Sequence, residues 1–215
     1  MKAFINYLKR LLLTSKKREA IFRRIAETNY WGDTESKSGA GSNIQTTQIL
    51  IPAIQKIIQD FDIKTILDAP CGDFNWMKHV VDERVSYHGV DIVSSLILEN
   101  KKKYNNTNVK FSKLDLVSDS FARYDLVICR DCFVHFSIAD IKKALNNIVA
   151  SETKYLLTTT FPNVNENIDI FTGKWRAINL EITPFNLKEV VFRIEEVRDP
   201  VNPQLVKQLV LFKLK

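Results

Sequence analysis

Short apolar runs rich in β-branched residues recur along the chain and alternate with segments of helical periodicity. The apolar runs cover residues 63–67, 85–90, 109–114, 124–129 and 154–160. Runs of this length, bounded by turn residues, are typical of strands buried in a parallel sheet. The segments expected to be helical cover 46–60, 74–82, 93–104 and 138–150. This alternation predicts an α/β domain.

The last third of the chain departs from the alternation. Residues Phe161 to Asn186 show little periodicity, which predicts a long irregular loop of the kind that often serves function. Val190–Val197 and Lys207–Leu214 are apolar again and are joined by a proline-bearing turn, which favours a closing hairpin. The complete prediction is a Rossmann-like, seven-stranded, mostly parallel sheet with a C-terminal antiparallel hairpin.

We divide the chain into an N-terminal basic amphipathic helical segment, residues 1–30, and one domain over residues 31–215. In the first segment apolar residues recur at helical spacing among lysines and arginines. Such a helix lies either on an anionic membrane surface or against its own domain or a partner subunit, and we favour the second placement. Lys9 and Arg10 interrupt the apolar stretch, which argues against a secretory signal. Ser42 or Asn43 is positioned to cap the helix that follows.

Acidic residues stand at the ends of the predicted strands. Asp68 opens the turn Asp-Ala-Pro-Cys-Gly, and Asp91 ends the next strand 23 residues later. That spacing fits one β-α-β unit, and a carboxylate at Asp91 can accept both hydroxyls of a ribose. Asp115 follows the third strand and Arg130-Asp131 the fourth. Carboxyl ends of parallel strands meet along one crevice, so we expect these groups to share a ligand site.

Together these motifs resemble class I S-adenosylmethionine (SAM)-dependent methyltransferases. The resemblance rests on residues 67–75, Gly89-Val90-Asp91, Lys113-Leu114-Asp115 and residues 125–135, and it spans residues 35–215. More narrowly, Asp68-Ala-Pro-Cys-Gly-Asp-Phe-Asn-Trp-Met with Cys129-Arg-Asp-Cys-Phe-Val-His resembles a bacterial subgroup associated with surface-polysaccharide modification. It implies a cytoplasmic enzyme that consumes SAM, releases S-adenosylhomocysteine (SAH) and methylates an oxygen of a small-molecule, sugar or phosphate-containing precursor of capsular polysaccharide.

The resemblance also implies which residues contact the cofactor. Asp68 and Gly72 would face the methionine and ribose, Asp91 the ribose hydroxyls, and either Asp115 or Leu116 the adenine. A serine-glycine loop before the first domain helix would close over the site. The full expected set is Ser38, Ser42, Asp68, Ala69, Pro70, Gly72, Asp73, Asp91, Ile92, Asp115, Leu116 and Arg130.

The first loop departs from the family pattern, because Pro70 and Phe74 stand where glycines are usual and only Gly72 remains. Proline donates no hydrogen bond, so the loop offers fewer amides to a ligand. A dinucleotide needs several amides on its phosphates, whereas SAM carries no phosphate. The departure therefore favours SAM over a nicotinamide dinucleotide.

Candidate catalytic residues follow the fourth strand. Asp131 and His135 are four residues apart, so on a helical turn they would share a face. A carboxylate beside an imidazole raises its basicity, so we expect His135 to be the base for a hydroxyl acceptor, with Asp131 orienting it or contacting substrate. For an acceptor that is already anionic, His135 would bind rather than deprotonate. The expected substrate contacts in the long loop are Trp175, Arg176 and Asn179, with Arg176 a clamp for phosphate or carboxylate.

Composition limits the classes of protein to which the chain can belong. The chain is 45% hydrophobic and 26% charged, as in soluble proteins, and has no apolar run long enough to span a membrane. Its net charge is +6, but several of the basic residues lie near the N-terminus, so nucleic acid is not an expected partner. Cys129 and Cys132 form a C-x-x-C pair without a second pair, and no metal is expected. The alternatives left open are an RNA methyltransferase and a non-catalytic SAM-binding subunit.

Overall fold

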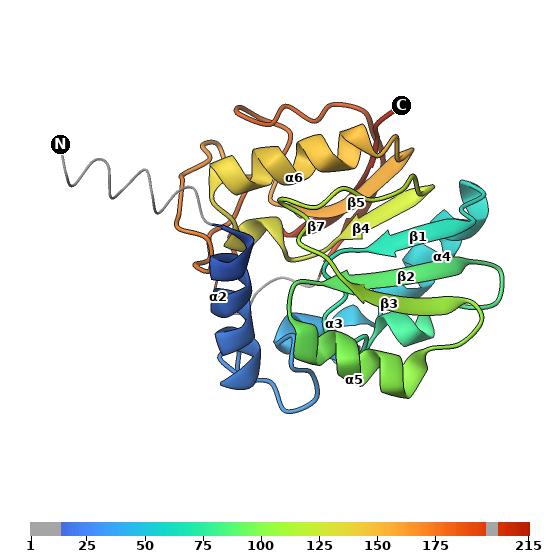
Figure 1. The fold of residues 1–215 in the computed structure, drawn as a ribbon. Helices are drawn as coiled ribbons and strands as arrows, with labels where there is room; N and C mark the ends of the chain where they lie inside the picture. Colours follow the sequence, from blue (N-terminus) through green and yellow to red (C-terminus); the bar gives the residue numbers. More distant parts are fainter. Residues whose placement is uncertain (1–13, 197–201) are drawn as a thin grey trace.

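The computed structural model describes residues 14–196 and 202–215, and these contain one seven-stranded sheet (Figure 1). The strand order is β3-β2-β1-β4-β5-β7-β6, with β1 to β5 parallel to their neighbours and β7 antiparallel to β5 and β6. The predicted fold class is therefore confirmed. The strands are β1 Thr65–Asp68, β2 Ser86–Asp91, β3 Val109–Lys113, β4 Leu126–Cys129, β5 Tyr155–Thr160, β6 Val190–Glu195 and β7 Gln208–Lys213.

Central strand β4 is buried along its whole length, which explains its uninterrupted apolar sequence. Leu126 and Ile128 belong to the core on one face of the sheet, and Val127 and Cys129 to the core on the other. The first core also holds the apolar stripe of α4 (Leu50–Asp60), whereas the second holds that of α6 (Ile138–Ala150). The sheet is thus a middle layer between helices, and its strand ends are rigidly placed.

The helices agree with the sequence pattern in most places. Those predicted over 93–104 and 138–150 are confirmed as α5 and α6, while the segment 46–60 is divided between α3 and α4. Asn43 caps α3, since its side chain accepts a hydrogen bond from the Thr46 amide at 2.8 Å. The remaining bounds are α2 Ser15–Glu27, α3 Ile44–Thr47, α5 Ser94–Tyr104, and the 3₁₀ turns η1 Ala40–Ser42, η2 Met77–His79 and η3 Phe133–His135.

The helix predicted over 74–82 was wrong, because only the short turn η2 forms there. Phe74 has a positive φ of 59°, which no α-helix accommodates. Its ring packs in the core at centroid distances of 4.9 Å from Tyr87, 5.1 Å from Phe111 and 5.3 Å from Tyr104. Aromatic packing therefore overrides helical propensity in this segment.

Helix α2 packs on the domain itself. Ile25 and Arg18 are buried, and the Phe22 ring lies 5.8 Å from that of Phe136. Residues 1–13 of the predicted N-terminal helix lie outside the described residues. Within 14–196 and 202–215, no helix has both the length and the apolar character that a membrane crossing requires.

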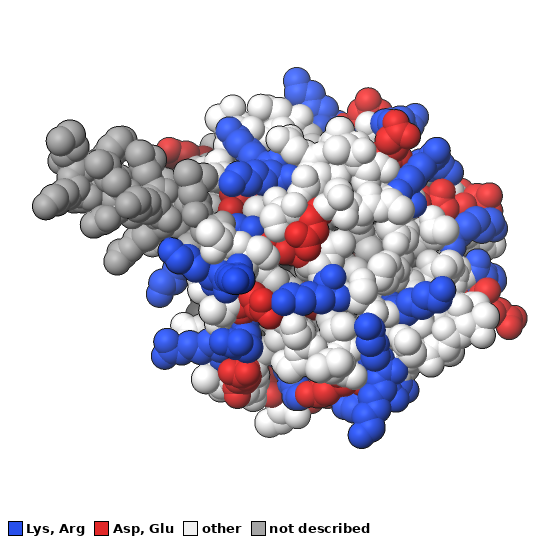
Figure 2. Space-filling model, viewed as in Figure 1, with Lys and Arg blue, Asp and Glu red and all other residues white. Residues whose placement is uncertain are grey.

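Charged residues of both signs are interspersed over the face of the molecule that Figure 2 shows. An RNA methyltransferase predicts a basic stripe along its crevice. Figure 2 shows no such stripe on the face that it draws.

Candidate active site

A cavity of about 530 Å³ opens at the carboxyl ends of the parallel strands. This is the edge of an open α/β sheet where ligands bind. Its walls come from α2, the loop before α3, the β1, β2, β3 and β4 ends, η3 and the 161–186 loop. Most of the predicted cofactor residues line it, namely Ser38, Ser42, Asp68, Ala69, Pro70, Gly72, Asp91, Ile92, Asp115, Leu116 and Arg130.

The turn after β1 brings the main chain to the floor of the cavity. The Cys71 amide donates to the Val90 carbonyl at 2.8 Å, which ties this turn to β2. Gly72 has a φ of 54°, and a Cβ there would lie 2.1 Å from the Ser38 Oγ. The one glycine that the loop retains is therefore required by both its conformation and its neighbour. Phe74 takes the place of a further glycine without obstructing the cavity, because its side chain is in the core.

Two buried carboxylates stand at the cavity floor. Asp68 accepts a hydrogen bond from the Tyr87 hydroxyl at 2.6 Å, and burial raises its pKa to about 7. Asp91 accepts from the amides of Gly72 at 3.2 Å and Val93 at 2.8 Å, and burial raises its pKa to about 6. Among residues 14–196 and 202–215 no ion pair is formed with either carboxylate, so a ligand with ammonium or hydroxyl donors would relieve their desolvation.

The serine-glycine loop lies over this floor, as the sequence predicted. Ser38 and Ser42 line the cavity, whereas Asp73 does not. The Asp73 carboxylate instead accepts from the Ser36 hydroxyl at 3.0 Å and the Lys37 amide at 2.8 Å. The assignment of Asp73 to the cofactor is corrected: it tethers the loop, since its hydrogen-bonding capacity is taken by that loop's donors.

Arg130 lies in a charged network beside the floor. Its guanidinium donates to the Gly41 carbonyl at 2.7 Å and to Glu196 at 2.5 Å, and it lies 5.4 Å from the Trp76 ring centroid. Within the described part of the chain, its Nε has no hydrogen-bond partner although it is buried. Buried donors are rarely left unpaired, so this Nε is an unmet donor inside the charged network.

Asp131 belongs to the same network and is not paired with His135. Its carboxylate accepts from Lys207 at 2.7 Å and from the Thr159 hydroxyl at 3.0 Å. Arg130 and Lys207 hold its pKa well below the usual range. The predicted shared helical face was wrong, because Asp131 has a positive φ of 52° and η3 begins only at Phe133. Asp131 does line the cavity, so the other expected role, contact with the substrate, stays a prediction.

His135 lines the cavity and is oriented by the main chain. Its Nδ1 lies 3.0 Å from the Lys174 carbonyl, which can only accept, so Nδ1 carries the proton and Nε2 the lone pair. Burial lowers the pKa of this imidazole, and the hydrogen bond to Lys174 and the charge of Asp131 oppose this shift without reversing it. The imidazole is thus neutral at pH 7. The ring lies 5.2 Å from that of Trp31.

Two of the three predicted substrate residues are used inside the protein. Arg176 donates to the carbonyls of Phe133 at 2.8 Å, Phe136 at 2.8 Å and Ile168 at 3.1 Å. Burial lowers its pKa to about 10, and it does not line the cavity. The prediction of a phosphate clamp at Arg176 is corrected, because the guanidinium holds η3 against the long loop.

Asn179 is likewise structural. It is buried, its amide donates to the carbonyls of Val164 at 3.0 Å and Pro162 at 3.2 Å, and it is not a cavity residue. Trp175 differs, since it lines the cavity, is 49% exposed and lies edge-on to Phe161. Of the three, Trp175 alone lines the cavity.

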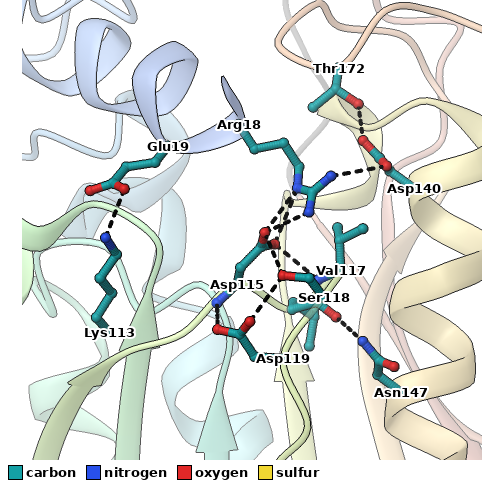
Figure 3. Close-up of polar contacts among 11 residues, drawn as sticks. Arg18, Glu19, Lys113, Asp115, Val117, Ser118, Asp119, Asp140, Asn147 and Thr172 are labelled. Carbon is teal, nitrogen blue, oxygen red and sulfur yellow. Dashed lines mark hydrogen bonds and ion pairs between the residues drawn. The ribbon is translucent and has the colours of Figure 1, made fainter. Parts of the chain in front are cut away.

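Asp115 lines the cavity, but its carboxylate is engaged by Arg18 of α2 (Figure 3). Arg18 Nη2 and Nε lie 2.6 Å and 3.1 Å from Asp115 Oδ2. The Ser118 hydroxyl at 3.0 Å and the Val117 amide at 3.1 Å donate to the same carboxylate. A carboxylate offers about four lone-pair sites, so little capacity remains for an adenine amino group. Of the two expected adenine contacts, the structure therefore favours Leu116.

Sequence reasoning missed the cavity residues of α2 and of the turn after it. Arg18, Phe22 and Ile25 lie on one helical face, at spacings of four and three residues, which could have marked Arg18 as buried. Trp31 and Trp76 also line the cavity. Neither tryptophan lies in a sequence pattern that distinguishes a residue lining a cavity from a residue of the core.

The fold and part of the sequence match known methyltransferases. A family model described as a methyltransferase domain matches residues 67–151. Magnesium protoporphyrin IX methyltransferase from Synechocystis PCC 6803, solved with bound SAM, superposes with a TM-score of 0.64 at 15% identity, covering 94% of this chain and 98% of that one. The fold is that of a class I methyltransferase.

A second class I methyltransferase structure covers a comparable share of both chains. It is the 1,6-didemethyltoxoflavin-N1-methyltransferase of Burkholderia thailandensis with 1,6-didemethyltoxoflavin and SAH, at a TM-score of 0.65 and 15% identity, covering 94% of this chain and 91% of that one. The named substrates of the two enzymes differ, so the shared fold does not define an acceptor. No protein of curated function matches the chain.

Proposed function

We propose that this chain is a SAM-dependent methyltransferase that methylates an oxygen of a small acceptor. The observation that carries the proposal is one cavity at the strand ends whose walls include the buried carboxylates of Asp68 and Asp91 and the arginine Arg130. These groups complement a ligand that carries an ammonium, ribose hydroxyls and a carboxylate. SAM has all three.

The residues present fit this cofactor. Asp91 would accept from the ribose hydroxyls, as its place at the β2 end requires. Asp68 would accept from the methionine ammonium, and the positive charge of Arg130, which lines the cavity, would attract the methionine carboxylate. Leu116 and Ile92 would pack against adenine. When bound, SAM supplies an electrophilic methyl group on a sulfonium.

His135 is the group positioned to take a proton from the acceptor. Since Nδ1 donates to the Lys174 carbonyl, Nε2 is the basic atom. Its lowered pKa keeps the ring neutral near pH 7, which is the form able to accept a proton. A hydroxyl acceptor beside Nε2 can therefore be activated, whereas an acceptor that is already anionic needs no base.

Methyl transfer to a panel of acceptors tests the proposal. The first arm is nucleotide-linked sugars and other capsular polysaccharide precursors, the class that the sequence resemblance implies. The second arm is hydroxylated aromatic compounds, because Trp31 and Trp175 offer flat walls near His135. Labelled methyl groups from SAM in either arm, with SAH released in equal amount, support the proposal. Tight SAH binding with no transfer to any hydroxyl compound would favour a non-catalytic subunit instead.

Replacing His135 tests the assigned base. We expect His135→Gln to lower kcat at least about a hundredfold while SAH affinity stays at the wild-type value. The matched control is His79→Gln, an exposed histidine in η2. Wild-type activity should rise with pH through a value below 6.5 and then level off. Unchanged turnover in His135→Gln would remove this residue from the mechanism.

A further inference from the structure

Helix α2 forms one wall of the cavity, although the class I fold itself is built from the residues that follow it. Arg18, Phe22 and Ala26 of α2, with Tyr30 and Trp31 just after it, all line the cavity. Figure 1 shows α2 standing beside the ends of the strands, next to α5 and α6. A bound cofactor in the cavity would therefore be in contact with this helix.

One arginine fastens α2 to two separate parts of the domain (Figure 3). Arg18 pairs with Asp115 after β3 at 2.6 Å and with Asp140 of α6 at 3.4 Å. Asp140 in turn accepts from the Thr172 hydroxyl of the long loop at 2.7 Å. The three ionic side chains are at most 4% exposed. Arg18 thus joins α2 to the segment after β3, to α6 and, through Asp140, to the long loop.

An ion-paired cluster of this kind can hold α2 against the domain and still allow it to detach. A buried ion pair offers modest net stabilisation because each charge gives up its hydration, and the charges regain water when the helix lifts. Without Arg18, however, two buried carboxylates would be left uncompensated. The docked position of α2 therefore depends on this guanidinium as well as on its apolar contacts.

The same helix contacts the segment that carries His135. A Cβ on Gly173 would lie 2.5 Å from Ile21 Cγ2, so the long loop and α2 are in close contact. The Gly173 amide donates to the His135 carbonyl at 2.8 Å, and Phe22 packs on Phe136. Helix α2 thereby contacts both Asp115, at the part of the cavity where the cofactor is proposed to bind, and the segment that carries the proposed base.

We propose that Arg18 is a positioning residue that retains the cofactor, by holding α2 across the cavity through Asp115 and Asp140. SAM binding and SAH release then require Arg18 to leave both carboxylates. The inference rests on the proposed function. It assigns Asp115 to the attachment of α2, in place of the adenine contact expected from its position after β3.

Stopped-flow tryptophan fluorescence tests this with SAH, since Trp31 and Trp76 line the cavity. We expect Arg18→Gln to raise the SAH release rate at least about tenfold and to raise the association rate as well. Arg18→Lys should restore part of the wild-type retention. The matched control is Arg23→Gln on the exposed side of α2, whose rates should equal those of the wild type. A loss of folded structure alone would lower affinity without speeding association.

The outcomes separate the two proposals. Wild-type protein that is folded but binds no SAH contradicts the proposed function. Wild-type protein that binds SAH, with unchanged rates in Arg18→Gln, contradicts the role of Arg18 alone. If Arg18→Gln does not fold, Asp140→Asn is measured in its place, and faster association and release are again expected. Hydrogen exchange should then show α2 amides becoming less protected in Asp140→Asn, and unchanged protection would overturn the proposal.

Discussion

Asp68→Asn should stabilise the ligand-free protein at neutral pH. Burial raises the pKa of Asp68 to about 7, against 3.8 for an unperturbed aspartate. Between about pH 4 and 7 the folded chain therefore holds a proton that the unfolded chain has lost. The unfolded state binds fewer protons in this window, so stability falls as pH rises, by up to about 1.4 kcal/mol per pH unit for one group.

The magnitude follows from the width of that window. A pKa shift of this size corresponds to about 4 kcal/mol, and the amide protons of the new asparagine offset part of it, so we expect about 2–4 kcal/mol near pH 7.5. For a chain of this size the melting temperature should rise by roughly 5–15 °C. Near pH 4 the variant and the wild type should differ little, because Asp68 is protonated in the folded chain and only partly ionised in the unfolded one.

Differential scanning calorimetry of the ligand-free wild type and Asp68→Asn, from pH 4 to 8, measures this difference in stability. Asp60→Asn, at the exposed end of α4, is the matched control and should leave the pH dependence unchanged. The same Asp68→Asn protein should bind SAH more weakly, since it lacks the charge proposed to meet the ammonium. The reasoning would be refuted if Asp68→Asn is less stable than the wild type at pH 7.5 and its free energy of unfolding depends on pH as that of the wild type does.

Two further substitutions test the site's architecture. Gly72→Ala should lower stability by about 1–3 kcal/mol and weaken SAH binding, because the new Cβ displaces Ser38. The control is Gly32→Ala, where φ is 68° and nothing lies within 4 Å of the added Cβ. This control should show only the smaller cost of an alanine at positive φ. Equal effects on stability and SAH binding would contradict the close approach of Gly72 to Ser38. Arg176→Gln should lower the melting temperature by several degrees, because hydrogen bonds to three carbonyls are lost. Lys174→Gln is the neighbouring control. If Arg176→Gln instead raises the KM for the acceptor and leaves the melting temperature unchanged, Arg176 is a substrate clamp after all.

The strands and the strand-end carboxylates were readable from the sequence because they follow from local pattern. An apolar run followed by an acid reports both burial and the end of a strand, and Asp68 and Asp91 lie where that pattern puts them. The long loop was correctly expected to be irregular, and Trp175 does line the cavity.

The polar loop residues could not be assigned in the same way. Asp73, Arg176 and Asn179 each satisfy donors or acceptors of distant main chain, and a sequence pattern does not reveal such partners. The pairing of Asp131 with His135 was wrongly predicted because the positive φ of Asp131 breaks the expected helical spacing. The pairing of Arg18 with Asp115 joins residues 97 positions apart, which local periodicity cannot show.

Isothermal titration calorimetry with SAH tests the central claim most directly. The account predicts saturable binding of one SAH per chain to the wild type, and binding that is weakened at least about tenfold in Asp91→Asn because the ribose hydroxyls lose a charged acceptor. A folded wild-type sample that releases or absorbs no heat with either SAH or SAM, at two temperatures, would contradict it.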